Sequence, residues 1–274
     1  HQGQRHDGVR GQAVPMILDL DHTLGCGQVF RWKKERGLWK GVVDSRLAVL
    51  RQDGPGVRIL SGMDQERFRS YFRLEDDLEG VYAELGGDPV LADYIERYRG
   101  LRLIRQDPWE CLASYVLATN ANIPRIQGMI ERVCRTFGEE MDGFFAFPTP
   151  ERLLDRCQRA EGCGLGYRAK RFIELAGMAY REEFDLDAFR SMGYEECVRE
   201  LVRLPGVGPK VADCVSVFSL EHLEAFPVDV RIRRAMAELY GMQGSYRQVS
   251  RAARERFGRW AGYAQEYIYY AYGR

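Results

Sequence analysis

The strongest constraint on the fold is a single change of residue pattern near residue 60. Between about Pro15 and Leu60, short runs rich in β-branched and aromatic residues (VFRW, LWKGVV, RLAVLR and VRIL) alternate with glycine and proline. This pattern is typical of short antiparallel strands joined by turns. From Asp64 onward, apolar residues recur at helical spacing. The sequence therefore predicts an α+β fold, with an N-terminal antiparallel β-sheet lobe followed by a larger all-helical region.

Within RLAVLR, Leu47 and Val49 are expected to form the buried face of a strand. Thr149 followed by Pro150 predicts the start of a helix, because a hydroxyl cap precedes proline at the first helical position. The helical pattern predicts helices over 64–73, 76–86, 90–99, 108–119, 123–137, 150–158, 168–181, 194–203, 209–220, 230–240, 246–258 and 261–272.

The expected domains follow from the same change of pattern. Residues 1–14 are polar and glycine-rich, lack the apolar segment of a secretory signal, and are predicted to be a flexible leader. Residues 15–105 are predicted to form the β-rich lobe with flanking helices. Residues 106–274 are predicted to form the helical core, which contains a hairpin at 201–220.

Composition narrows the setting of the protein. The 274 residues include seven cysteines, none in a CxxC pair, which favours a reducing, intracellular compartment. No apolar run is long enough to span a bilayer, so no membrane partner is expected. The formal net charge is zero. Nucleic-acid binders are often basic, but a local basic cleft is compatible with a neutral total.

The most informative segment is LPGVGPK, which lies between two helical patterns. Pro205 ends the first helix, and Gly206 and Gly208 permit a tight turn that a phosphate can approach closely. The backbone N–H groups and the dipole at the start of the second helix then attract an anion. Such a hairpin anchors a protein on DNA independently of base sequence.

Lys210 opens the second helix, where the positive end of the helix dipole favours the neutral amine, the nucleophilic form of lysine. Cys214 lies four residues later on the same helical face. Asp229 precedes another helix, which it can cap, and Arg231, Arg233 and Arg234 give that helix start a phosphate-facing character. Taken singly, these residues are more often just a turn, a solvated lysine and a capping aspartate. Together, their order and spacing are far more specific.

This arrangement resembles the helix-hairpin-helix DNA glycosylase superfamily, specifically its 8-oxoguanine DNA glycosylase/lyase branch. The matching segments are CGQVFRW, DPWECLASYVLATNANIPRIQGMIERVC, GLGYRAKR, LPGVGPKVADC, PVDV and AGYAQEYIYY. The resemblance implies that Lys210 is the nucleophile and Asp229 the essential acid. It also implies a bifunctional enzyme that excises 8-oxoguanine from duplex DNA through a Schiff base and nicks the strand by β-elimination. Two alternatives stay open: a glycosylase for another lesion, and a non-catalytic DNA-binding module.

The resemblance also implies a base pocket. The carbonyl of Gly27 would accept a hydrogen bond from N7–H, which 8-oxoguanine has and guanine lacks. Gln265 would reach the pairing edge, with Cys214 and Tyr269 against the two faces of the base. Tyr269 stands where relatives often have phenylalanine. The unpaired cytosine and the gap in the duplex would be met by Asn120, Arg125, Tyr167 and Arg168. Ala121 departs from an all-asparagine triplet in relatives.

The remaining expectations concern cofactors and partners. No cofactor is expected, and no cysteine follows Cys214, so an iron–sulfur cluster of the endonuclease III type is not expected. The resemblance implies a monovalent cation held by the carbonyls of Leu204 and Val207. Gly206, Gly208 and Arg231, which replaces a histidine of some relatives, are expected at the DNA backbone. The expected partner is double-stranded DNA containing oxidised guanine, bound by a monomer in the cytoplasm or nucleoid of a bacterium or the nucleus of a eukaryote.

Overall fold

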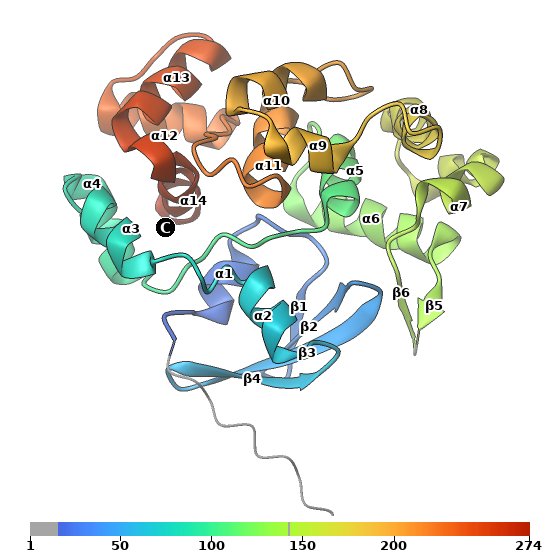
Figure 1. The fold of residues 1–274 in the computed structure, drawn as a ribbon, viewed down its shortest axis with the longest axis horizontal. Helices are drawn as coiled ribbons and strands as arrows, with labels where there is room; N and C mark the ends of the chain where they lie inside the picture. Colours follow the sequence, from blue (N-terminus) through green and yellow to red (C-terminus); the bar gives the residue numbers. More distant parts are fainter. Residues whose placement is uncertain (1–15, 142) are drawn as a thin grey trace, which may run out of the picture.

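A small β-sheet lies at one end of the molecule and helices make up the rest (Figure 1). The structure, a computed structural model, describes residues 16–141 and 143–274; the leader predicted at 1–14 lies outside them. The sheet is antiparallel in the order β1-β2-β3-β4, as the sequence predicts. Its strands are β1 (Lys33–Glu35), β2 (Leu38–Val43), β3 (Arg46–Asp53) and β4 (Gly56–Ser61).

One face of this sheet covers a small hydrophobic core, but it is not the face that the sequence pattern suggested. Ala48 and Leu50 are fully buried, whereas Leu47 and Val49 are only half-buried. The four residues are consecutive and all apolar, so alternation alone cannot tell which pair points inward. The choice is made by helix α2 (Gln65–Tyr71), because its Phe68 belongs to the same core as Ala48 and Leu50.

The prediction of a strand at VFRW is wrong. Residues 29–32 have no regular structure, and β1 begins only at Lys33. Phe30 is buried in the large core of the helical region, while Trp32 is buried in the small core under the sheet. The Trp32 ring lies so close to Gly41 of β2 that a Cβ there would be 2.4 Å from it. The side chains of this segment therefore serve two separate cores, which a regular strand pairing does not achieve.

The predicted helices are all present, within a few residues at each end. Thr149 caps α7 by accepting a hydrogen bond from the N–H of Arg152. Two six-residue helices, α1 (Leu20–Gly25) and α9 (Leu186–Ser191), were not predicted. The other helices are α3 (Leu78–Leu85), α4 (Pro89–Arg97), α5 (Pro108–Leu117), α6 (Ile123–Phe137), α7 (Pro150–Asp155), α8 (Arg168–Tyr180), α10 (Tyr194–Leu201), α11 (Pro209–Ser219), α12 (Val230–Tyr240), α13 (Tyr246–Phe257) and α14 (Ala261–Ala271).

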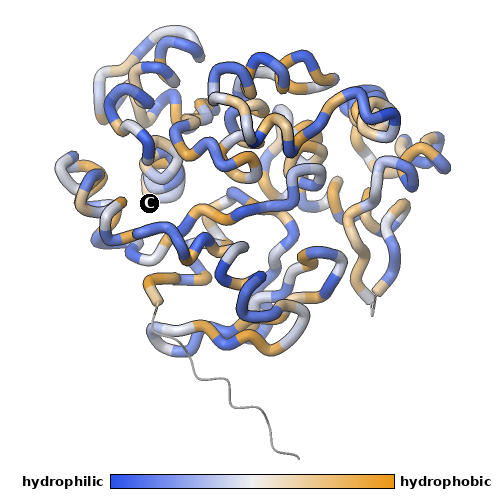
Figure 2. Tube along the Cα trace, viewed as in Figure 1, coloured by the Kyte–Doolittle hydropathy of each residue, from blue (hydrophilic) through white to orange (hydrophobic). Residues whose placement is uncertain are grey.

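Short 3₁₀ helices at Cys157–Cys163 and Gly258–Trp260, and a two-strand ribbon of β5 (Glu140–Met141) and β6 (Phe144–Phe145), complete the described elements. Blue and orange positions alternate along the helices in Figure 2, as expected for elements with one buried face. Every helix in the described part of the chain is too short or too polar to cross a bilayer.

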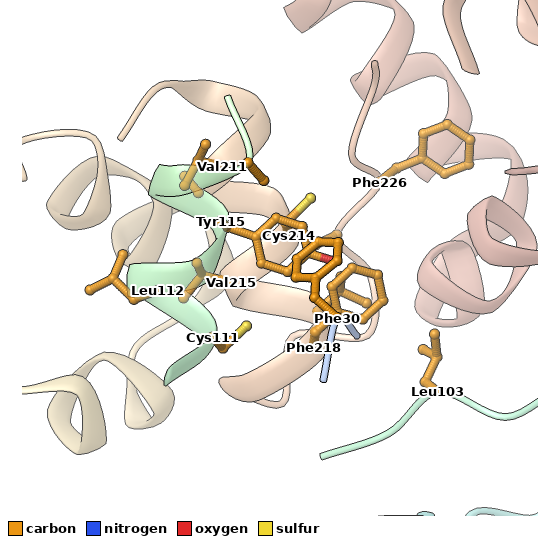
Figure 3. Packing of buried hydrophobic residues seen from close by; sticks show 14 of the residues in the cluster. Phe30, Leu103, Cys111, Leu112, Tyr115, Val211, Cys214, Val215, Phe218 and Phe226 are labelled. Carbon is orange, nitrogen blue, oxygen red and sulfur yellow. The ribbon is translucent and has the colours of Figure 1, made fainter. Parts of the chain in front are cut away.

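The large core is centred on α5, α11 and α14. Tyr115 of α5 packs against Phe30 and Phe218, at ring-centroid distances of 5.3 and 5.7 Å, beside Cys214 (Figure 3). Helix α14 approaches α11 closely at Gly262, where a Cβ would be 2.4 Å from Cγ2 of Val217. This close approach fixes the position of the next turn of α14 relative to α11.

Gln28, between α1 and β1, ties its segment to the chain before α5 and to α5 itself. The buried amide of Gln28 donates to the carbonyls of Thr23 (2.9 Å) and Arg102 (2.8 Å) and accepts from the N–H of Ile104 (3.0 Å). Its backbone carbonyl accepts a further hydrogen bond from the hydroxyl of Tyr115 (2.9 Å). Gly27, the neighbour of this anchored residue, is thereby held at the edge of the helical core.

Candidate active site

The predicted hairpin is present, and its two glycines have different roles. Helix α10 ends at Leu201 and α11 begins at Pro209. Gly206 has φ +80°, and a Cβ there would lie 2.9 Å from Cγ1 of Val116, so this position needs glycine for both backbone and packing. Gly208 has extended backbone and open space where a Cβ would be. No side chain caps the start of α11. The first N–H groups of α11 are therefore available to an anion.

The hairpin and the start of α12 bring Lys210 and Asp229 together. Lys210 is the second residue of α11, and its Nζ lies 5.1 Å from the centroid of the Tyr115 ring. Asp229 caps α12, and its Oδ1 accepts a hydrogen bond from the N–H of Ile232 at 2.7 Å. The cap fixes one carboxylate oxygen of Asp229.

Lys210 and Asp229 stand where two cavities meet. An outer groove of about 1030 Å³ runs along the hairpin, and an inner pocket of about 380 Å³ lies behind it. Both cavities are lined by Lys210 and Asp229, together with Ala118, Ala121 and Asn122. Gly206 and Gly208 line the outer groove only. A group that enters the pocket from the groove therefore passes the amine and the carboxylate.

The four residues predicted for the base pocket, Gly27, Cys214, Gln265 and Tyr269, all line the inner cavity. Gly27 has φ +105°, and a Cβ there would lie 3.1 Å from Cδ1 of Ile123 and 3.2 Å from Cε1 of Tyr269. Glycine at this position therefore keeps the pocket wall open. The amide oxygen of Gln265 is buried and without a hydrogen-bond partner among the residues that the structure describes.

The inner pocket favours neutral side chains. Burial raises the pKa of the Cys214 thiol to about 12, although the nearby Lys210 opposes the shift. Burial and the carboxyl groups of Asp229 and Glu266 raise the pKa of Tyr269 to about 12. Cys214 is therefore a thiol near neutral pH, and it presents an apolar surface to the cavity.

The residues predicted to meet the opposite strand gather at the turn after α5. Tyr167 is 59% exposed, and its hydroxyl accepts from Nδ2 of Asn120 at 3.1 Å. Arg168 is buried rather than solvated. Its guanidinium donates to the carbonyls of Thr119 and Asn120 and lies over the Tyr167 ring, 4.5 Å from the centroid. Arg125 is exposed on α6. Arg168 thus holds the turn that carries Asn120.

Arg231, predicted at the DNA backbone, is exposed and contacts the C-terminal residues. Its guanidinium donates to the carbonyl of Tyr272 and lies 5.4 Å from the centroid of the Tyr269 ring. Arg231 therefore packs against a wall residue of the inner pocket. Arg233, by contrast, lines the outer groove.

Sequence reasoning missed part of the pocket. Glu266 lines the inner cavity beside Gln265, although α14 is almost entirely buried. Burial raises the pKa of Glu266 to about 7. An acidic residue inside the apolar and aromatic pattern AGYAQEYIYY was the available signal. Arg171 and Tyr246, which line the outer groove, carried no such signal. Among the described residues, no group of three or more His, Cys, Asp or Glu side chains is placed to hold a metal ion.

A β-lobe followed by a helical region, with an anion-binding hairpin and a lysine–aspartate pair, defines a DNA base-excision protein of the helix-hairpin-helix class. Residues 113–259 match the HhH-GPD superfamily of base excision DNA repair proteins, and residues 13–112 match the N-terminal domain of 8-oxoguanine DNA glycosylase. The chain belongs to the 8-oxoguanine DNA glycosylase family.

Similar proteins support this assignment. A probable N-glycosylase/DNA lyase of Methanothermobacter thermautotrophicus is 32% identical, with 92% of both chains covered. The N-glycosylase/DNA lyase of Saccharomyces cerevisiae is 30% identical over 79% of this chain and 67% of its own. The DNA-free 8-oxoguanine glycosylase/lyase of Clostridium acetobutylicum has a similar structure, with a TM-score of 0.88, 34% identity and 93% of both chains covered.

Proposed function

We propose that this protein is a bifunctional DNA glycosylase/lyase, which excises 8-oxoguanine from duplex DNA and nicks the strand at the resulting site. The observation that carries the proposal is the position of Lys210 and Asp229 at the junction of the groove and the inner pocket. A base inside a duplex is out of reach of such a pair, so the target nucleotide must swing out of the helix. The base then occupies the inner pocket and its sugar lies at the junction.

Bond cleavage at the junction follows from the two side chains. The bond between C1′ and N9 of the base breaks, and its electron pair leaves with the base, which takes up a proton. Positive charge develops on the sugar, and the carboxylate of Asp229 stabilises it. The neutral amine of Lys210 forms a bond to C1′. Opening of the sugar ring then gives a protonated Schiff base between Lys210 and the sugar.

The same Schiff base accounts for the nick. Loss of a proton from C2′ and departure of the 3′ phosphate together constitute β-elimination, after which water releases Lys210. A glycosylase that used water as its nucleophile would have no need of a lysine at this position. The lysine is therefore what supports a lyase activity in addition to base release.

Discrimination of 8-oxoguanine from guanine is assigned to Gly27. The carbonyl of Gly27 accepts a hydrogen bond from N7–H of the lesion, and it repels the acceptor N7 of guanine. Gln265 contacts the pairing edge, and its unpartnered amide oxygen supports this role. Cys214 and Tyr269 pack against the faces of the base.

Contacts with the strand opposite the lesion are assigned to residues at and near the turn after α5. Tyr167 is exposed and able to wedge into the duplex. Asn120 and the exposed Arg125 contact the unpaired cytosine, whose O2 and N3 are acceptors. Arg168 joins them when its contacts with the turn open. Gly206, Gly208 and Arg231 contact the DNA backbone.

Borohydride trapping tests the proposed chemistry. Reduction of the Schiff base links the enzyme to the sugar, so the wild type is expected to form a covalent complex with 8-oxoguanine duplexes, and Lys210→Gln is expected to form none. The control is Lys33→Gln, which changes an exposed lysine of β1 that is paired with Glu131 of α6. Trapping of Lys210→Gln at the wild-type level would refute the assignment of the nucleophile.

The alternatives give different outcomes in the same assays. Equal excision of 8-oxoguanine and undamaged guanine, with efficient release of another damaged base, would favour a glycosylase for that other lesion. DNA binding without any base release by the wild type would favour a non-catalytic module. Varying the base opposite 8-oxoguanine in these duplexes measures the preference for cytosine.

We further propose a monovalent cation at the hairpin, held by the carbonyls of Leu204 and Val207. The Leu204 carbonyl accepts one hydrogen bond, from the N–H of Val207 at 3.1 Å, and keeps a second lone pair. DNA affinity that is unchanged on replacing potassium with a bulky organic cation would argue against this site. The protein is proposed to act as a monomer on cellular DNA, in the nucleoid or the nucleus; a mass of two chains by light scattering would contradict the monomer.

A further inference from the structure

The inner pocket contains a carboxyl group that the mechanism above does not use. Glu266 follows Gln265 on α14, lines the cavity and is 2% exposed. Its Oε1 is buried and has no hydrogen-bond partner within residues 16–141 and 143–274. A buried polar atom without a hydrogen-bond partner destabilises the protein, because its lost contact with water is not compensated. Such an atom in a ligand pocket indicates a hydrogen bond that forms only when the ligand is bound.

The neighbours of Glu266 indicate which part of the ligand it would meet. The Cys26 thiol lies beside the Glu266 carboxyl, and this carboxyl raises the pKa of Cys26 in addition to the effect of burial. Cys26 is bonded directly to Gly27, and Gln265 adjoins Glu266 on the other side. The Glu266 carboxyl is therefore flanked by the two residues that contact N7–H and the pairing edge of the base in the proposed function.

On 8-oxoguanine, O6 is the polar atom between N7–H and N1–H. It is an acceptor, so its partner in the pocket must be a donor. The carbonyl of Gly27 cannot donate. A protonated carboxyl group has one O–H donor, and its geometry suits a carbonyl acceptor.

We propose that Glu266, as a neutral carboxylic acid, donates a hydrogen bond to O6 of the extruded 8-oxoguanine and so helps to specify the base. This inference rests on the proposed function and adds a contact to it. It makes the pocket complementary to an oxygen at C6 and not to an amino group. An ionised Glu266 would have the reverse preference, because it is only an acceptor.

The protonation state of Glu266 supports this role. Burial raises its pKa to about 7, and Asp229 adds to the shift, whereas Cys26 and Lys210 oppose it. The carboxyl is thus mostly neutral below about pH 7 and mostly ionised above it. The titratable groups around it, on α5, α11, α14 and the ends of α1 and α12, are Cys26, Tyr115, Lys210, Cys214, Asp229 and Tyr269.

The test compares two oxidised purines with different groups at C6. 8-Oxoguanine and 8-oxoadenine share the N7–H and the C8 carbonyl, but 8-oxoadenine has an amino group at C6, no hydrogen on N1 and no amino group at C2. The readout is therefore the change of the rate ratio with pH and not the ratio itself. Single-turnover excision of each base, opposite cytosine and at sub-saturating enzyme, is measured from about pH 6 to about pH 8. The ratio of the two rates cancels any effect of pH that acts equally on both substrates. We expect the preference for 8-oxoguanine to fall about tenfold over this interval, as Glu266 ionises.

Two variants separate a contact with the base from other roles. Glu266→Gln keeps the shape of the side chain but does not titrate, so its selectivity ratio is expected to be flat with pH. Glu266→Leu is expected to lower 8-oxoguanine excision about tenfold or more. Glu255→Gln, at an exposed position on α13, is the charge-matched control and should keep the wild-type slope. Thermal unfolding of Glu266→Gln verifies that the variant is folded.

A flat ratio in the wild type, or a wild-type slope in Glu266→Gln, would overturn the proposal. Nicking of a duplex with a preformed abasic site provides the remaining arm, because that substrate has no base to contact. If Glu266→Gln shifted the pH profile of this reaction as much as that of 8-oxoguanine excision, Glu266 would act through Lys210, and the proposal would again fail. Failure of the proposed function itself is distinct: the wild type would then release no 8-oxoguanine at any pH.

Discussion

Gly27 illustrates how one missing side chain shapes a binding site. Its φ of +105° disfavours any L residue, and the space where a Cβ would be is bounded by Ile123 and Tyr269. Backbone and wall thus impose the same requirement independently. Because Gly27 has no side chain, its backbone lines the cavity directly.

Gly27→Ala is expected to reduce excision of 8-oxoguanine at least tenfold while affecting nicking at a preformed abasic site much less, because the added methyl group narrows the base pocket and not the junction. Backbone strain alone should cost about 1–3 kcal/mol of stability. Gly37→Ala, on the β1–β2 turn, is the matched control, since Gly37 has φ +78° and a Cβ there would have nothing within 4 Å. Single-turnover rates and thermal unfolding measure both effects. Equal losses on the two substrates would contradict the role of Gly27 in the base pocket.

At the scale of elements, the two glycines of the hairpin between α10 and α11 meet different requirements. Gly206 needs its positive φ and its contact with Val116, whereas Gly208 has ordinary extended backbone beside open space. The space at Gly208 borders the N–H groups of α11. The fold therefore does not require glycine at position 208.

We expect Gly208→Ala to change stability by less than about 0.5 kcal/mol, as for surface substitutions, yet to weaken binding of duplex DNA about tenfold. A methyl group there would obstruct a phosphate at the start of α11. Gly206→Ala should instead lower stability by about 2 kcal/mol or more, through strain and overpacking. Thermal unfolding and fluorescence anisotropy with a labelled duplex distinguish the two. Unchanged DNA affinity of Gly208→Ala would remove the hairpin from the interface.

Elements with long, regular patterns could be predicted from the sequence, and short or dual-purpose segments could not. The helix from Ile123 to Phe137 has its predicted bounds because fifteen residues repeat a 3.6-residue period. Helices α1 and α9 have six residues each, too few to reveal a period. The prediction of a strand at 29–32 is wrong because the apolar residues Phe30 and Trp32 are buried in two different cores.

The residues of the candidate site also differ in whether the sequence could predict their placement. Lys210 and Asp229 were predictable because their spacing in LPGVGPK and PVDV belongs to a recognisable motif. Burial of Arg168 was not, because its partners are backbone carbonyls of the turn at Thr119 and Asn120, which no residue pattern encodes. Glu266 escaped notice because its significance depends on an unpaired oxygen, which is a property of the folded pocket.

At the scale of the whole molecule, the sheet lobe and the helical region share one pocket. Gln28 ties the segment that carries Gly27 to the chain between α4 and α5, through hydrogen bonds with Arg102 and Ile104. The predicted division at residues 105 and 106 stays a prediction. Helices α3 and α4, which precede it, contribute Leu78 and other residues to the large core.

Gln28→Ala is expected to destabilise the protein by about 3 kcal/mol, because it leaves several buried backbone groups without partners. It should also lower 8-oxoguanine excision more than nicking at an abasic site, since Gly27 loses its support. Gln52→Ala is the matched control: Gln52 makes similar bonds, to Leu18 and Leu20, within the sheet lobe. It should destabilise without changing the ratio of the two activities. A similar change of that ratio in both variants would show that Gln28 has no special link to the pocket.

The shared pocket has a consequence for how such enzymes diversify. The groups assigned to bond breaking lie on the hairpin and the start of α12. Of the groups assigned to holding the base, Gly27 precedes β1 and two others lie on α14, whereas Cys214 shares α11 with Lys210. Mutations near Gly27 and in α14 would therefore alter which lesion is removed while the hairpin chemistry is inherited unchanged. Such enzymes can therefore evolve toward new damaged bases without losing the residues assigned to bond breaking.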